Sequence, residues 1–469
     1  METVRVCRVC GQINPSLDST RCSSCFAFLE RSEAVSRDEA ERHARRFRIP
    51  LWRKSYLFLT LALILGWTAW KAVTMFDVVP LVIPPPGAST DIGAVSGPHT
   101  WSQARQNARG TAFTPDPAPF PGKVKWTFST SKPLVTSPAV VDGRVYLTTD
   151  DGRTLALEEQ TGRVVWEYRS GRPSSSTPAV TADLVISAVR PGQVVALDRA
   201  TGRVVWERDI DSPILSSPIV ADGTVFLGSA DKNLYALDAA TGRQRWSFAT
   251  DNWITETVAY VDGTVAVVSQ GSNLNIVGAR TGRRQLIYNT GRSRRIGGGP
   301  VIQGDTVYFG SVDGSVWAVD RKARTYPFGR AILLWKLNFF FWGIIPEPIQ
   351  KGSIWSTFVG GDLMRTPAVT PNAVYAANRQ GKVTALDAAT GKKLWVSEVA
   401  SEITSPPSVA GSTVLVGTSD GIVFGLDGAT GEILWDFKTG GKVTASPVVA
   451  GDTMYVASHD GTLYAVTGR

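Results

Sequence analysis

Apolar and polar residues alternate along most of this chain in short stretches that are separated by turn dipeptides. The segment VDGRVYLTTDDGRTLALEEQTGRVVW, which begins at Val141, shows the pattern clearly. A period of two predicts β-strands with one buried face, and the dipeptides DG, DG and TG are typical of tight hairpin turns. One such segment therefore predicts four short antiparallel strands.

The same unit recurs at near-constant spacing. A phrase of the form S/T-P-x-V marks each copy, and the spacings between successive copies are 40, 40, 40, 42, 67, 39 and 41 residues. The marker positions are Pro138, Pro178, Pro218, Pro367, Pro406 and Pro447, with degenerate copies at Val258 and Pro300. A repeat of about 40 residues made of four strands is typical of the blade of a β-propeller.

The two ends of the repeat region predict how the ring closes. The last unit stops at LYAVTGR and lacks a final tryptophan strand, whereas GKVKWTFST, residues 122–130, is such a strand without a unit before it. Pairing the two removes both free sheet edges. The prediction is an all-β fold, an eight-bladed propeller of four-stranded blades over residues 122–469.

The turn phrase A-L-D-x-x-T-G-x-x-x-W resembles the repeat of the pyrroloquinoline-quinone (PQQ) family of quinoprotein-like propellers, which includes the outer-membrane protein assembly scaffold. The resemblance implies that a tryptophan of each outer strand packs on a glycine and an alanine of the next blade. The segment around Trp101, Arg105 and Gly110 also resembles the lead-in of such propellers. The expected blade-docking residues are Trp126, Trp166, Trp206, Trp246, Trp335, Trp395 and Trp435, with Leu286 in the fourth copy.

The family also contains PQQ-dependent alcohol and glucose dehydrogenases, so the resemblance leaves an enzyme as the alternative. Those enzymes need metal-binding carboxylates and, in many cases, adjacent cysteines. The propeller has no cysteine, and its recognisable aspartates sit at turn positions, where they bond their own backbone. We therefore expect a non-catalytic scaffold or sensor that does not use PQQ, because a shared fold does not transfer chemistry.

One insertion interrupts the repeat and suggests a partner-binding surface. Between Trp335 and Pro367, residues 336–358 read KLNFFFWGIIPEPIQKGSIWSTF. An exposed loop rarely holds so many apolar residues, so we expect contact with a protein, a cell-envelope polymer or a membrane. The alternative is a hairpin that plugs the channel or covers a blade. The candidate residues are Phe339, Phe340, Phe341, Trp342, Ile344 and Ile345.

Arg294 and Arg295 lie in the loop that leaves the fourth unit. They could attract an anionic partner, although a solvated loop is the simpler explanation. Both this loop and the insertion are expected to run from an outer strand to the next inner strand. The prediction is that they share one face of the propeller.

The N-terminus, CRVCGQINPSLDSTRCSSC, contains two C-x2-C pairs. Two such knuckles complete a tetrahedral zinc site, which is closed and therefore structural. A redox dithiol or two disulfides are the alternatives. Residues 1–30 resemble a short bacterial zinc ribbon, although Phe26 stands where a second-knuckle glycine is usual. The expected ligands are Cys7, Cys10, Cys22 and Cys25.

A basic segment and an apolar segment follow. Residues 31–54 contain eight Lys and Arg, residues 55–76 are apolar, and residues 72–104 contain no Lys or Arg. A 22-residue helix would reach about 33 Å and could cross a bilayer. The charge asymmetry places the N-terminus in the bacterial cytoplasm and the propeller outside, beyond a Pro-rich linker and lead-in at residues 77–121. A buried helix or a cleaved signal are the alternatives.

The distribution of charge argues against a nucleic-acid partner. The net charge is +8, and residues 1–54 hold 11 Lys and Arg against 7 Asp and Glu, so +4 lies in this short segment. The basic character is therefore not spread over the propeller, and no nucleic-acid partner is expected.

Overall fold

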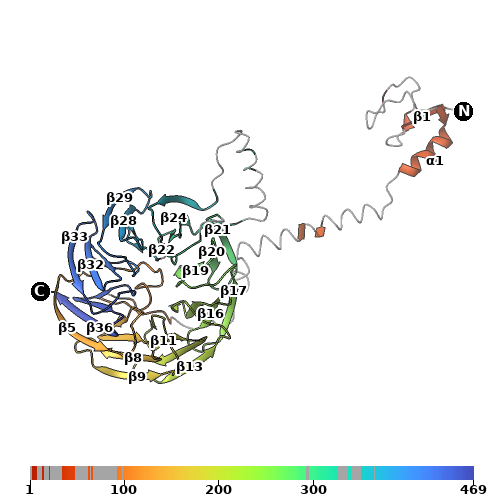
Figure 1. Cartoon of the computed structure of the whole chain (residues 1–469). Helices are drawn as coiled ribbons and strands as arrows, with labels where there is room; N and C mark the ends of the chain where they lie inside the picture. The colour runs from red at the N-terminus through yellow and green to blue at the C-terminus, as the bar shows by residue number, and fades with distance from the viewer. Residues whose placement is uncertain are drawn as a thin grey trace. The chain divides into compact units, whose positions relative to one another are not determined.

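The structure is a computed structural model that describes residues 3–7, 13–14, 21, 34–47, 62–63, 65–66, 92–97, 99–291, 295–325, 336, 339, 350–363 and 365–468. The chain divides into two compact units, Met1–Ala72 and Val73–Arg469. The larger unit contains eight sheets in a ring (Figure 1), so the predicted all-β, eight-bladed propeller is confirmed.

Each blade holds four antiparallel strands in order from the axis outward, and these are consecutive in the chain in blades 1 to 7. Blade 1 contains β6 (Ala139–Val141), β7 (Arg144–Thr148), β8 (Arg153–Glu158) and β9 (Val164–Arg169). Blade 2 contains β10 (Ala179–Val180), β11 (Leu184–Val189), β12 (Gln193–Asp198) and β13 (Val204–Asp209). Blade 3 contains β14 (Ile219–Ala221), β15 (Thr224–Gly228), β16 (Asn233–Asp238) and β17 (Gln244–Ala249). Blade 4 contains β18 (Ala259–Val261), β19 (Thr264–Val268), β20 (Asn273–Gly278) and β21 (Arg284–Asn289).

The second half of the ring continues in the same way. Blade 5 contains β22 (Val301–Gln303), β23 (Thr306–Gly310), β24 (Ser315–Asp320) and β25 (Ser353–Phe358). Blade 6 contains β26 (Ala368–Val369), β27 (Ala373–Ala377), β28 (Lys382–Asp387) and β29 (Lys393–Glu398). Blade 7 contains β30 (Ser408–Ala410), β31 (Thr413–Gly417), β32 (Ile422–Asp427) and β33 (Ile433–Lys438), and β4 (Phe113–Thr114) pairs with β30 in parallel. Blade 8 contains β34 (Val448–Ala450), β35 (Thr453–Ala457), β36 (Thr462–Gly468) and β5 (Pro121–Ser129).

Blade 8 closes the ring with strands from both ends of the propeller. Strand β5 pairs with β36 in an antiparallel register that places Trp126 opposite Ala465. The early strand thus supplies the outer strand that the last unit lacks, as its sequence predicts. Closure of this kind leaves no open edge between the first and last blades.

The outer-strand tryptophans hold neighbouring blades together, as the example of Trp206 shows. Its indole Nε1 donates to the Ala239 carbonyl of the next blade at 2.9 Å, and only 8% of the residue is exposed. A Cβ on Gly242 would come within 2.5 Å of the Trp206 ring, so the glycine of the TG turn leaves room for it. Indole Nε1 groups make the same contact from Trp126, Trp166, Trp246, Trp355 and Trp395.

The docking tryptophan of blade 5 is Trp355, and the expectation for Trp335 is wrong. Trp355 lies in β25, donates to the Ala388 carbonyl at 3.0 Å and packs over Gly391. Trp335 lies outside the described residues. The error arises because ILLW and SIW both match the local pattern of an outer strand.

This correction also moves the insertion. It interrupts the connection between β24 and β25, so the last six residues of the predicted insertion, residues 353–358, are the outer strand itself. Connections between third and fourth strands lie at the opposite end of a blade from connections that lead to the next blade, because neighbouring strands are antiparallel. The described ends of this connection, residues 321–325 and 350–352, therefore lie on the opposite face from Arg295, which precedes an innermost strand, and the prediction that both loops run from an outer to an inner strand on one face is wrong.

The described part of the N-terminal unit includes a small sheet and the helix that follows it. The strand order is β2 (Ile13–Asn14), β1 (Thr3–Val6) and β3 (Ala34–Ser36), followed by α1 (Arg37–Phe47). Cys7 directly follows β1 and is 1% exposed, whereas Cys10, Cys22 and Cys25 lie outside the described residues. Of residues 55–76 only four are described, and among the helices that the structure describes none is long and apolar enough to cross a membrane.

Candidate functional site

The lead-in segment, residues 92–116, lies along the innermost strands and forms a ring inside the propeller. Innermost strands have one unpaired edge, which normally needs a partner. The amide of Val140 in blade 1 donates to the Trp101 carbonyl at 2.8 Å, and its carbonyl accepts from the Trp101 amide at 2.8 Å. The amides at the same repeat position also donate to lead-in carbonyls, from Val180 to Ser102, Tyr260 to Ala108, Ile302 to Arg109, Val369 to Thr111 and Val409 to Ala112.

Two blades use side chains of the lead-in instead. In blade 3, the Val220 amide donates to Gln103 Oε1 at 2.9 Å. In blade 8, the Gly451 amide donates to Asp116 Oδ2 at 2.8 Å. All eight blades are therefore bonded to one continuous segment, which fixes their positions around the axis.

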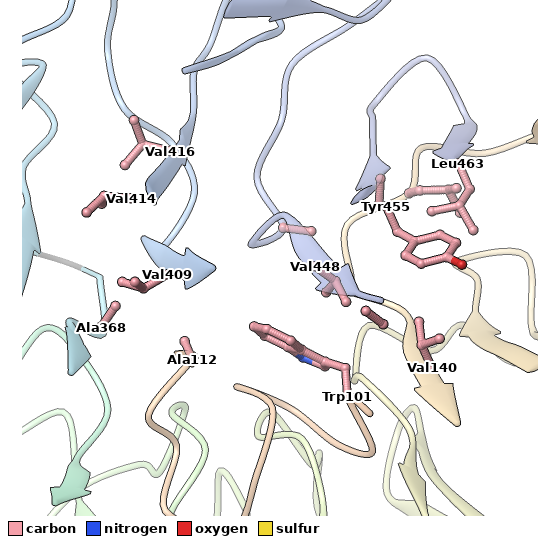
Figure 2. Packing of buried hydrophobic residues seen from close by; sticks show 14 of the residues in the cluster. Trp101, Ala112, Val140, Ala368, Val409, Val414, Val416, Val448, Tyr455 and Leu463 are labelled. Atoms are coloured by element: carbon pink, nitrogen blue, oxygen red, sulfur yellow. The ribbon is translucent and has the colours of Figure 1, made fainter. Parts of the chain in front are cut away.

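Trp101 anchors this segment in the hydrophobic core. It is 1% exposed and belongs to the largest buried cluster. Figure 2 shows its ring between the inner strands, with Val140 on one side and Val448 and Ala112 nearby. Burial of a whole indole makes this residue a strong tether for the lead-in.

Arg105 of the lead-in bonds to residues that lie close to the axis of the propeller. Its guanidinium donates to the carbonyl oxygens of Pro367 at 2.5 Å and Pro407 at 2.8 Å, and to Ser446 Oγ at 3.1 Å. These partners belong to blades 6, 7 and 8. One side chain thus bonds three blades close to the axis.

Two other charged residues, Glu256 and Arg365, lie near Arg105. Both differ from the residue that is usual at their position of the repeat. The position directly before the S/T-P phrase is occupied by Thr136, Ser176, Ser216, Glu256, Gly298, Arg365 and Ala445, and Ser405 takes this place in blade 7, where Pro407 aligns with the prolines of the other blades. Small residues are the rule there, so Glu256 and Arg365 are the exceptions. Thr366 Oγ1 donates to Glu256 Oε2 at 3.5 Å and accepts from the Gly299 amide at 2.8 Å. Aligning the eight copies at this position would have found both residues.

Burial shifts the pKa values of Glu256, Arg105 and Arg365. Burial raises the pKa of Glu256 to about 7, although the positive charges of Arg365 and Arg105 act in the opposite direction. Burial lowers the pKa of Arg105 to about 9, against the effect of Glu256. Burial also lowers the pKa of Arg365. The cluster is therefore one carboxyl group between two guanidinium groups in a poorly solvated place.

The donor set of this cluster does not fit a metal-bound quinone. A hard cation such as Ca²⁺ takes six to eight oxygen ligands, several of them carboxylates. Glu256 is instead surrounded by positive charge, and no group of three or more His, Cys, Asp or Glu that could hold a metal occurs in the part of the chain that the structure describes.

The predicted partner residues are only partly described. The Arg295 guanidinium donates from Nη2 to Gln270 Oε1 at 3.0 Å, and Arg295 is exposed. Phe339 is half-buried. Arg294, Phe340, Phe341, Trp342, Ile344 and Ile345 lie outside the described residues.

Exposed apolar side chains occur in pairs on the outer strands of blades 1, 2, 5, 6 and 7. Phe358 and Ile354 of β25 are 64% and 47% exposed, and Leu394 and Val396 of β29 are 53% and 52% exposed. We call these four residues the apolar edge. In blades 1, 2 and 7 the two exposed apolar residues are adjacent at the start of the outer strand, and an acidic residue follows the tryptophan. The pairs are Val164 and Val165, Val204 and Val205, and Ile433 and Leu434, and the acidic residues are Glu167, Glu207 and Asp436.

The fold and the site together define a closed β-propeller with its own lead-in ring and an exposed apolar edge. The PQQ-like repeat family described as "Outer membrane protein assembly factor BamB" matches residues 117–177, 169–337 and 347–469. These matches cover well over half of the chain, so the protein belongs to this family.

Solved structures share the fold. BamB from Moraxella catarrhalis is 17% identical with a TM-score of 0.60 and covers 74% of this chain and 99% of its own. The computationally designed Ika8 protein is 18% identical with a TM-score of 0.61, over 74% and 100% of the two chains. Quinohemoprotein alcohol dehydrogenase from Comamonas testosteroni is 15% identical with a TM-score of 0.61, over 79% and 81%. No curated protein sequence matches the chain.

Proposed function

We propose that this protein is a non-catalytic scaffold that binds a polypeptide partner through the apolar edge of blades 5 and 6. The observation that carries the proposal is that exposed Phe358 and Val396 stand on neighbouring outer strands at positions where blades 1 and 7 have charged residues. Exposed apolar groups that lie close together are characteristic of association surfaces.

The chemistry of an outer strand favours a polypeptide over other partners. The outward edge of β25 has no strand partner among the described residues, so its main-chain groups can accept an added strand. Apolar side chains beside such an edge would hold alternate side chains of a bound segment. Membership of a family named for a protein assembly factor is consistent with a protein partner.

Site-specific photocrosslinking tests this proposal. A photoreactive residue at Phe358 or Val396 should give one and the same adduct in native membranes. Matched positions are Lys438 of blade 7 and Arg169 of blade 1, which occupy the same outward place in their strands as Phe358. Equal adducts at all four positions would contradict the proposal.

The quinoprotein alternative remains because the fold is shared with a quinohemoprotein dehydrogenase. The arginine-flanked carboxyl group of Glu256 supports the non-catalytic proposal, because it offers a cation a single, charge-compensated ligand. PQQ-dependent dye reduction by the purified chain with Ca²⁺ or a lanthanide would overturn it.

We further propose that the N-terminal unit is a structural zinc ribbon in the cytoplasm and that residues 55–76 anchor the propeller outside the cell. The position of Cys7 at the end of β1, before the paired strand β2, suits a knuckle between two strands. Metal analysis should give one zinc per chain, and Cys22→Ser should lose it. Protease added to spheroplasts should remove the propeller and spare residues 1–54, and the reverse pattern would refute this topology.

A further inference from the structure

A cavity of about 530 Å³ lies between the lead-in segment and blades 3 and 4. Its walls are residues 93–97, 100, 102–103 and 106–109 of the lead-in and, in the two blades, the ends of β14 and β18 with the turn residue that follows each, residues 220–222 and 260–262. This volume falls within the range of about 300–1,000 Å³ that small-molecule sites occupy. The cavity is separate from the apolar edge and from the Arg105–Glu256–Arg365 cluster, none of whose residues lines it.

Gln103 is the first indication that the cavity binds a ligand. The residue is 1% exposed, and its Oε1 accepts from the Val220 amide at 2.9 Å. This bond fixes the orientation of the amide group, and the side-chain NH₂ has no hydrogen-bond partner among the described residues. Gln103 lines the cavity, so this NH₂ can donate to an acceptor of a ligand bound there.

Gln103 offers a hydrogen-bond donor, whereas Asp222, held in place by Tyr260, offers an acceptor. The Tyr260 hydroxyl donates to Asp222 Oδ2 and accepts from the Gly263 amide at 3.0 Å, so it is held in place. Asp222 lines the cavity and is exposed, and its second oxygen accepts no hydrogen bond from the described residues. The carboxylate thus stands ready to accept from a ligand hydroxyl.

The charges at the cavity are balanced. Arg109 and Asp222 both line it and carry opposite charges, and Asp262 is paired with Arg321 at 3.1 Å. Neither an anion nor a cation is therefore favoured. Ala108 and Val220 add apolar surface between the polar groups.

We propose that this cavity binds one sugar unit of a neutral saccharide. A hydroxyl group both donates and accepts, so neighbouring hydroxyls can satisfy the Gln103 NH₂ and the Asp222 carboxylate together. The apolar wall fits the C–H face of a sugar ring. This binding does not depend on the polypeptide partner proposed above.

Calorimetric titration of the purified full-length protein with N,N′-diacetylchitobiose and maltose tests the proposal. Saturable binding of at least one disaccharide is expected, and Asp222→Asn should weaken it about tenfold by removing a charged acceptor. Asp142→Asn is the matched control, because Asp142 occupies the same turn position in blade 1, with φ 49° against 46° for Asp222, and lies outside the cavity.

Three outcomes would overturn the inference. They are the absence of saturable binding to both disaccharides, equal weakening by Asp222→Asn and Asp142→Asn, and tighter binding of galacturonate or glucosamine than of the neutral sugars. Tyr260→Phe gives a second test, because it removes the hydroxyl that orients Asp222 but keeps the ring that stacks on Phe226 at 5.8 Å. It should weaken binding less than Asp222→Asn.

Discussion

Blades 3 and 5 have the same strand pairing but different connections. In both, the third and fourth strands shift register directly after an alanine, Ala236 opposite Trp246 in blade 3 and Ala318 opposite Trp355 in blade 5. Blade 3 joins these strands through a short TG turn, whereas blade 5 joins them through residues 321–352. The pairing register, rather than the length of the turn, therefore defines a blade.

The ends of the long connection explain how blade 5 accommodates it. Thr325 donates from its amide to the Gln285 carbonyl of β21 at 2.9 Å, and its Oγ1 accepts from the Ile287 amide at 3.0 Å. Thr325, at the start of the connection, is thus bonded to the outer strand of blade 4 on both sides of Leu286, which replaces the docking tryptophan. Loop length itself costs little, because closure entropy grows only with the logarithm of length. The outer edge of blade 5 has no such cover among the described residues and carries the exposed apolar side chains.

The largest effect should come from removing the docking tryptophan of blade 5. Trp355→Ala deletes a ring that packs over Gly391 and donates to Ala388, so we expect a loss of about 3–5 kcal/mol in the free energy of unfolding. Denaturant unfolding measures it, with Trp206→Ala as the matched change in blade 2. Trp335→Ala should cost clearly less, and a cost equal to that of Trp355→Ala would restore the original assignment.

Removing the guanidinium group of Arg105 should have the next largest effect. Arg105→Met leaves acceptors of three blades without their donor and takes one positive charge from Glu256, so a loss of about 2–4 kcal/mol is expected. Arg109→Met, an exposed position on the same lead-in, is the control. Equal losses in thermal or denaturant unfolding would show that the cluster does not hold the blades together.

The pH dependence of stability tests the same cluster with a smaller effect. Because the pKa of Glu256 is raised in the folded state from 4.5 to about 7, the unfolded chain releases this proton first as the pH rises. The free energy of unfolding should therefore fall by about 1–3 kcal/mol between pH 4.5 and pH 7. Glu256→Gln should remove this part of the slope. An unchanged slope in the variant would mean that the carboxyl group of Glu256 titrates normally.

The sequence predicts this fold well because the fold is made of repeats. Eight copies of the same alternation and turn residues, together with the isolated strand around Trp126, are enough to predict the number of blades and their closure. The prediction failed where the repeat is interrupted, because Trp335 and Trp355 both follow apolar residues. A local pattern cannot say which of two similar segments pairs with β24.

The candidate sites were harder to predict for a related reason. The lead-in contacts are backbone hydrogen bonds between residues far apart in the chain, such as Trp101 and Val140, and no residue pattern reports them. Glu256 and Arg365 could have been found because they replace the small residue that directly precedes the S/T-P phrase in other blades. The half of the apolar edge that lies in β25 was missed because the sequence analysis assigned residues 353–358 to a loop. Alternate residues can be predicted to point outward only where the segment is known to be a strand.

The most direct test of the account measures partner binding by variants of the two kinds of outer strand. Phe358→Ser with Val396→Thr changes the apolar edge, and Val165→Thr with Val205→Thr changes equally exposed positions of blades 1 and 2. Both double variants should keep the free energy of unfolding within about 0.5 kcal/mol per site, because these side chains are exposed. Co-purification of the photocrosslinked partner from native membranes should fall at least about tenfold for the first variant, the equivalent of about 1.4 kcal/mol, and stay unchanged for the second. Retention of the partner by the first variant, or equal loss by both, would contradict the assignment of the binding surface to blades 5 and 6.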